Sequence, residues 1–278
     1  MGNGQRIEYN RVGKLKKAMK EEIRFNQYVQ NYNPQDPLIR LKLIHTWKVV
    51  QAADGIAESL QLSESQKRLV HLAALFHDIG RFEQVRRFHT FVDAKSVDHA
   101  KLGASILEQE DFLLDLTAEE RSQVIEAVRV HSLFAIPIDH TGFQKTLDQI
   151  LRDADKIDIF RVGVEEKPDA TASGRTLDHL EDERISPAVY KAICDRRSVL
   201  RNERASVLDF WIAFLGFVFD LNFQHSFQLV LEQGYWKMPV SAMLEEGKIT
   251  DLSTQKQLED ILQKTQEALE KGAGKTAD

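Results

Sequence analysis

The helical spacing of apolar residues along most of the chain restricts its fold more than any other feature. Between residues 38 and 60, in LIRLKLIHTWKVVQAADGIAESL, apolar side chains recur every three or four residues, which is the period of one face of a helix. Two capping boxes, SESQ at 63–66 and TAEE at 117–120, begin further helices, because their side chains satisfy backbone groups of the first turn. Convincing strand patterns are absent from the sequence, which therefore predicts an all-α fold.

Other stretches show the same helical spacing. They cover 99–109, 146–160, 187–200, 205–221, 223–233 and 253–272. The helix that begins at the first capping box is expected to run to about Gly80, which would be its C-cap. Ser186 and Pro187 favour a helix start, because serine is a common N-cap and proline fits the first helical position. Segment 162–186 is charged and lacks apolar periodicity, so we expect a loop or lid there.

The composition argues against several classes of protein. Lys and Arg total 37 against 43 Asp and Glu, and the net charge of −6 comes from mixed signs along the chain, which disfavours general nucleic-acid binding. The single cysteine, Cys194, cannot form an internal disulfide or a cysteine-based metal cluster. The first residues lack the apolar region of a signal peptide, and the longest apolar run, 210–219, is too short to cross a bilayer. We therefore expect a cytoplasmic protein that does not bind membranes.

One set of histidines and aspartates points to metal chemistry. Its members lie on the inner face or near an end of successive predicted helices: His45, His77, Asp78, His99, His131 and Asp155. His77 and Asp78 are adjacent at the end of a buried apolar run, where a group without a partner would cost several kcal/mol. Imidazole and carboxylate are the ligands of zinc, iron, manganese and similar ions. Each histidine alone could be an ordinary core residue, but the whole set predicts a divalent metal site.

The spaced motif H…HDIG…H…H…DADK resembles the HD superfamily of metal-dependent phosphohydrolases, over about residues 38–160. The longer segments ALFHDIGRFEQ, VRVHS and LRDADKID are similar to uncharacterised bacterial HD-domain hydrolases. Several spaced elements agree, whereas a single His-Asp doublet would carry little weight. The resemblance implies an HD-domain helical bundle over 38–160. Outside this range, we expect an N-terminal helical segment over 1–37 and additional C-terminal helices over 161–278 that pack on the core.

The resemblance also implies how the metal is bound. Four residues of the motif would hold one ion: His45, His77, Asp78 and Asp155. In the two-metal branch of the family, His99 and His131 hold a second ion and Asp78 bridges the two. Asp153 is an alternative to Asp155, which is preferred because it directly precedes the lysine of the family pattern. The expected cofactors are one or two divalent ions among Mn, Fe, Zn, Co, Ni and Mg.

The resemblance implies hydrolysis of a small phosphorylated substrate, which could be a phosphomonoester, a nucleotide or a phosphodiester. A divalent ion lowers the pKa of bound water towards about 7, so no nucleophilic side chain is needed, and no nucleophile-elbow motif is present. Asp78 at the metal and Arg81, as the cation for the phosphoryl oxygens, are the expected catalytic residues. Weaker basic candidates are Arg86, Arg87, Lys95 and Lys101. The GYP signature of cyclic-dinucleotide phosphodiesterases is missing, which argues against that substrate.

Two other functions remain open. A di-iron oxygenase is one alternative, because a minority of HD proteins cleave C–C or C–P bonds with oxygen. The six ligands suit both functions. A non-catalytic signalling module would usually have lost ligands, and none is missing here. A homodimer formed through the amphipathic helix over 253–272 is compatible with all three functions.

Overall fold

The structure is a computed structural model that describes residues 19–166 and 176–274. All regular elements in these two ranges are helical, which confirms the predicted all-α fold. Within the same ranges, no helix combines the length and the apolar character that a membrane span requires.

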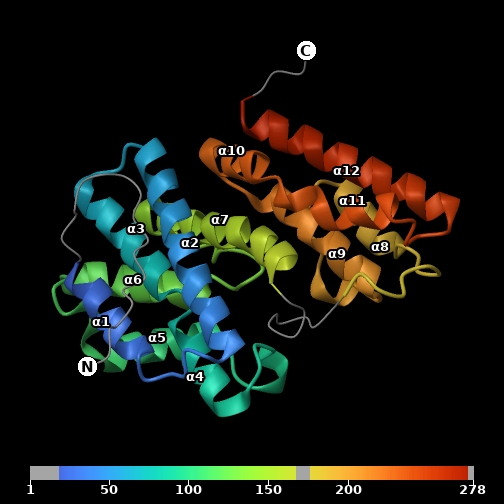
Figure 1. Cartoon of the computed structure of the whole chain (residues 1–278). Helices are drawn as coiled ribbons and strands as arrows, with labels where there is room; N and C mark the ends of the chain where they lie inside the picture. The colour runs from blue at the N-terminus through green and yellow to red at the C-terminus, as the bar shows by residue number, and fades with distance from the viewer. Residues whose placement is uncertain (1–18, 167–175, 275–278) are drawn as a thin grey trace.

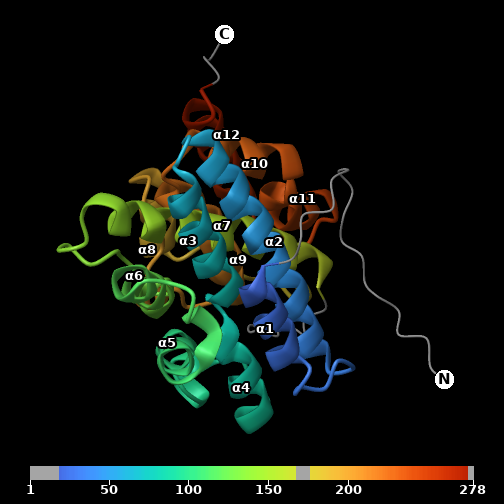
Figure 2. The same cartoon turned by 90° about the vertical axis from the view of Figure 1, so that its left-hand side faces the viewer.

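Seven α-helices lie within residues 19–166, which form the first half of the described structure. They are α1 (Lys20–Val29), α2 (Pro37–Ser59), α3 (Glu64–Phe76), α4 (Ile79–Phe88), α5 (His99–Gln109), α6 (Ala118–Val130) and α7 (Gly142–Glu165). Helices α2, α3 and α7 pack against one another, α6 packs on α3 and α7, and α4 packs on α5. Figures 1 and 2 show α4 and α5 at the bottom of this half. The predicted capping boxes at Ser63 and Thr117 start α3 and α6.

Five further α-helices lie within residues 176–274, which form the second half. They are α8 (Pro187–Cys194), α9 (Val207–Leu215), α10 (Gln224–Gln233), α11 (Met238–Glu245) and α12 (Leu252–Gly272). Helix α12 is the predicted amphipathic helix, and its buried face packs on α8, α10 and α11. Helices α10 and α11 also contact α7, and α10 contacts α2, so the second half lies against α2 and α7 of the first half (Figure 1).

Two helices of the second half are shorter than the sequence pattern predicts. The helix expected over 187–200 ends at Cys194, and Arg196 just beyond it has a left-handed backbone conformation with a φ of 54°. The helix expected over 205–221 becomes a 3-10 helix at Gly216. Apolar periodicity identifies the residues that face the core, but it does not distinguish a tightened turn from a continuing α-helix.

Helix α7 is longer than the sequence pattern predicts, because it ends inside the segment 162–186 that we expected to be a loop. An i,i+4 ion pair between Arg161 and Glu165, at 3.0 Å, stabilises the additional turn. Residues 167–175 of this segment lie outside the described residues, and 176–186 form turns and irregular chain. The predicted start of the loop was therefore wrong by about one turn.

The prediction for Gly80 was also wrong. Helix α3 ends at Phe76, and Gly80 lies in the first turn of α4 rather than at a C-cap. A Cβ atom at Gly80 would overlap the backbone carbonyl oxygen of His99 and would lie 2.7 Å from the amide nitrogen of Gly103. Gly80 is therefore required for the close approach of α4 and α5, and not for a left-handed turn.

We expect Gly80→Ala to lower the free energy of unfolding by about 1–3 kcal/mol, because the added methyl group pushes α4 away from α5. Gly163→Ala is the matched control, because Gly163 is also helical and its Cβ would only make an ordinary 3.6 Å contact with Trp211. The control should raise the free energy of unfolding by about 0.5–1 kcal/mol. Urea denaturation measures both changes, and equal stability of the two variants would contradict the role given to Gly80.

Candidate metal centre

The structure brings all six residues predicted as metal ligands into one cluster. They are His45, His77, Asp78, His99, His131 and Asp155. They come from α2, the link between α3 and α4, the start of α5, the end of α6, and α7. Five of these residues are buried, whereas the side chain of Asp155 is 20% exposed. Asp155 is therefore the member of the cluster that solvent reaches most easily.

Asp78 lies between two pairs of histidines. Its Oδ2 atom is 3.4 Å from Nε2 of His77 and 3.6 Å from Nε2 of His45. Its Oδ1 atom is 3.6 Å from Nε2 of His99 and 3.8 Å from Nε2 of His131. Each oxygen of one carboxylate therefore faces a different pair of imidazoles.

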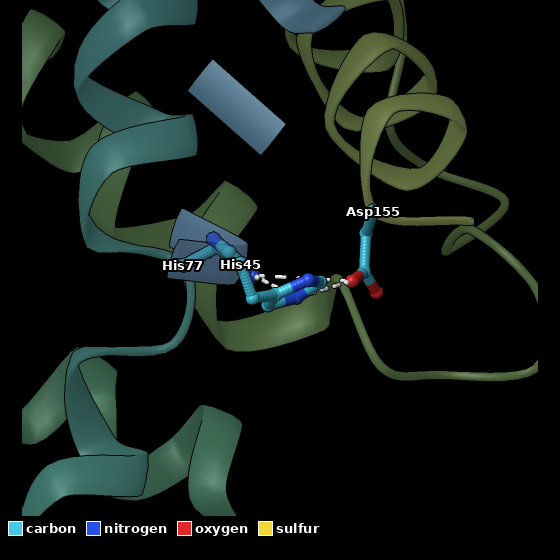
Figure 3. A group of neighbouring side chains, drawn as sticks. All are labelled: His45, His77 and Asp155. Atoms are coloured by element: carbon cyan, nitrogen blue, oxygen red, sulfur yellow. Dashed lines mark hydrogen bonds and ion pairs between the residues drawn. The ribbon is translucent and has the colours of Figure 1, made fainter. Parts of the chain in front are cut away.

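Asp155 completes the first group. Its Oδ1 atom lies 3.1 Å from Nε2 of His45 and 3.9 Å from Nε2 of His77, and these two nitrogens are 3.3 Å apart. Figure 3 shows the Asp155 side chain extending from α7 toward the two imidazoles. The carboxylate of Asp153 instead accepts hydrogen bonds from the backbone and side-chain amides of Asn222, at 2.9 and 2.8 Å. Of the two aspartates considered from the sequence, Asp155 is the one that faces the cluster.

The outer ring nitrogens of His77 and His131 bind backbone carbonyl groups. Nδ1 of His77 is 2.8 Å from the oxygen of Ala74, and Nδ1 of His131 is 2.7 Å from the oxygen of Val128. A carbonyl oxygen can only accept a hydrogen bond, so each Nδ1 atom carries a proton. In the neutral ring, Nε2 is then a lone-pair acceptor that points into the cluster.

Two carboxylates have the same role for the other two histidines. Nδ1 of His45 donates to Asp158 at 2.7 Å, and Nδ1 of His99 donates to Asp93 at 2.7 Å. Sequence reasoning missed both carboxylates. Asp158 could have been found from its spacing, because it lies three residues after Asp155 in α7. Asp93 follows no pattern that identifies it in the sequence.

These contacts leave neutral imidazoles facing each other. Burial, together with the nearby His99 and His77, lowers the pKa of His131 to about 3. Burial and the charge of Arg81 also lower the pKa of His99. Both rings are therefore neutral at pH 7, and their Nε2 atoms, only 3.2 Å apart, present lone pairs to each other. A cation beside these two nitrogens and Asp78 would remove the repulsion, so the donor set fits a divalent ion.

Lys42 is a further charged residue at the cluster that sequence reasoning missed. Its Nζ atom lies 2.5 Å from Oδ2 of Asp78. Burial alone would raise the pKa of Asp78, but the charge of Lys42, the largest opposing influence, holds that pKa well below its usual range. Asp78 is consequently an ionised carboxylate in a buried position.

Arg81 also contacts Asp78, but much of its guanidinium is engaged by the protein itself. Nη1 donates to the side chains of Gln84 and Asp93, at 2.8 and 2.9 Å, and to the carbonyl oxygen of Phe91 at 2.7 Å. Nε is buried, has no hydrogen-bond partner among the residues that the structure describes, and lies 3.5 Å from Oδ1 of Asp78. This arrangement suits a residue that positions Asp78 and Asp93, and binding of phosphoryl oxygens by Arg81 stays a prediction. Three of the weaker basic candidates pair with other carboxylates: Arg86 and Arg87 with Glu83, and Lys101 with Asp98.

Residues 43–159 match the family model of the HD domain. The chain carries an HD domain. The matched range contains all six residues of the cluster and confirms the resemblance noted in the sequence. HD domains are generally metal-dependent hydrolases, and the His and Asp groups of this one could hold a metal ion. No curated protein and no solved structure matches the chain.

Asp153→Asn and Asp155→Asn form a matched pair that separates a packing role from a metal-binding role. Asp153→Asn should lower the free energy of unfolding by about 1–3 kcal/mol, because one amide oxygen cannot replace two carboxylate oxygens as acceptors. Its metal content should stay at the wild-type level. Asp155→Asn should lose bound metal and change the stability of the metal-free protein less. Elemental analysis and urea denaturation in chelator test this expectation, which the opposite assignment of the two effects would contradict.

Proposed function

We propose that this HD domain holds two divalent ions and hydrolyses a small phosphorylated substrate. The substrate would be a phosphomonoester, a nucleotide or a phosphodiester. The observation that carries the proposal is the position of Asp78, whose two oxygens face two different pairs of histidines. A single carboxylate between two sets of nitrogen ligands suits a pair of ions better than one ion.

The donor atoms divide into two groups around Asp78. His45, His77, Asp155 and Oδ2 of Asp78 would hold one ion, and His99, His131 and Oδ1 of Asp78 would hold the other. Divalent ions supply a bound water of lowered pKa and charge that offsets the phosphoryl oxygens. Asp158 and Asp93 orient His45 and His99 through their Nδ1 protons, which also increases the basicity of Nε2.

The charges beside the cluster favour a phosphohydrolase over a di-iron oxygenase. Lys42 and Arg81 both lie within 3.5 Å of Asp78, and positive side chains at a reaction centre stabilise the negative oxygens of a transferring phosphoryl group. A neutral substrate of an oxygenase would gain much less from them. Oxygen uptake by the iron-loaded protein without release of phosphate would favour the oxygenase instead.

We expect metal-stripped protein to release phosphate from at least one phosphorylated metabolite when Mn²⁺, Co²⁺, Mg²⁺ or Fe²⁺ is added. Asp78→Asn should lower kcat/KM by at least about 100-fold and reduce bound metal, because Asp78 faces both groups of ligands. Glu83→Gln is the control. Glu83 is a buried carboxylate of the neighbouring helix α4, where it binds Tyr32, Arg86 and Arg87 instead.

A phosphate-release assay and elemental analysis of wild type, Asp78→Asn and Glu83→Gln test the proposed function. The control should keep the metal content and activity of wild type. Full activity and full metal content in Asp78→Asn would overturn the proposal, as would the absence of phosphate release from every compound tested with each metal.

A further inference from the structure

The two cations at Asp78 are held in different ways. Nη1 of Arg81 makes three hydrogen bonds to other parts of the protein. Nζ of Lys42 has one hydrogen-bond partner among residues 19–166 and 176–274, which is Oδ2 of Asp78. An ammonium group has three donors, so Lys42 retains donors that a further acceptor can use.

Lys42 also lies closer to solvent than the carboxylate it binds. Its side chain is 14% exposed, against 3% for Asp78. The ring of Phe91 packs beside it, with Nζ 5.2 Å from the ring centroid, and the guanidinium of Arg81 lies 5.5 Å from the same centroid. The aromatic ring keeps part of the water away from both cations, which strengthens their attraction for an anion. Lys42 therefore lies at the edge of the cluster, in a position that a substrate can reach.

Lys42 occupies an oxygen that a metal ion would need. Oδ2 of Asp78 faces Nε2 of His45 and of His77 as well as the ammonium group. Two cations that share one carboxylate oxygen repel each other. The lysine stem has four flexible carbons and can move its ammonium group elsewhere, whereas the histidine rings are held through their outer nitrogens.

We propose that Lys42 binds the phosphoryl oxygens of the substrate. Its ammonium group neutralises Asp78 in the metal-free protein. In the metal-loaded protein the carboxylate of Asp78 would bind the metal ion, and the ammonium group of Lys42 would bind an oxyanion at the edge of the cluster. The inference rests on the proposed function and names the residue that binds the anionic group of its substrate.

Lys42→Met should therefore change two affinities in opposite directions. Binding of Mn²⁺ in the absence of phosphate should become about tenfold tighter, because a competing positive charge is removed from Asp78. Binding of inorganic phosphate to the Mn²⁺-saturated protein should become at least about tenfold weaker, because a charged donor is lost. Lys42→Arg should restore part of the phosphate affinity. Lys48→Met, which removes an exposed lysine of the same helix, should change neither affinity.

Isothermal titration calorimetry with Mn²⁺, and then with inorganic phosphate, measures both affinities without relying on catalysis. A residue that merely supports the fold would weaken Mn²⁺ binding when replaced. Weaker Mn²⁺ binding in Lys42→Met, or an unchanged phosphate affinity, would overturn the inference. Lys42→Gln should also bind Mn²⁺ more tightly and phosphate more weakly, and it replaces Lys42→Met in the experiment if the methionine variant does not fold. Wild-type protein that binds Mn²⁺ and phosphate as expected but hydrolyses no phosphorylated compound would overturn the proposed function and leave the role of Lys42 in anion binding intact.

Discussion

The arrangement of helices α1 to α7 depends on one interaction, the burial of the ionised Asp78 carboxylate among four imidazole rings. A buried charge is costly unless it is paired and its remaining lone pairs are satisfied. Lys42 and Arg81 pair with Asp78, and the imidazoles approach it from α2, α5 and the ends of α3 and α6. No single helix could present this many polar groups to one point, so the cluster requires several elements to converge.

The orientation of each imidazole follows from its place in a helix. His77 and His131 are C-cap residues, so their Nδ1 atoms bind carbonyl groups three residues earlier, which the end of a helix leaves without partners. His45 lies mid-helix and His99 starts a helix, where no such carbonyl is free. Carboxylates from other elements serve these two rings. Both arrangements direct Nε2 inward, and rings held in this way form a preorganised set of donor atoms that could hold a metal ion.

Close packing of the backbone supports the same arrangement. Because Gly80 lacks a side chain, α4 approaches the start of α5 closely enough to place His99 beside Asp78. On the other side, Asp153 binds the amide groups of Asn222 just before α10, while Asp155, two residues later, faces the cluster. Helix α7 therefore connects the candidate metal centre with the second half of the molecule through adjacent turns.

The sequence by itself determined the helical class, most helix starts and the identity of the six candidate ligand residues, because periodicity, the capping boxes at Ser63 and Thr117 and residue type are local properties. Only the tertiary structure decided the partners of those residues. Lys42 and Asp93 contact the cluster from positions that no periodicity distinguishes, and contacts between residues far apart in sequence depend on how the helices pack. The break at Phe76 likewise follows from the contact between α4 and α5, which a helical pattern read along one segment does not contain.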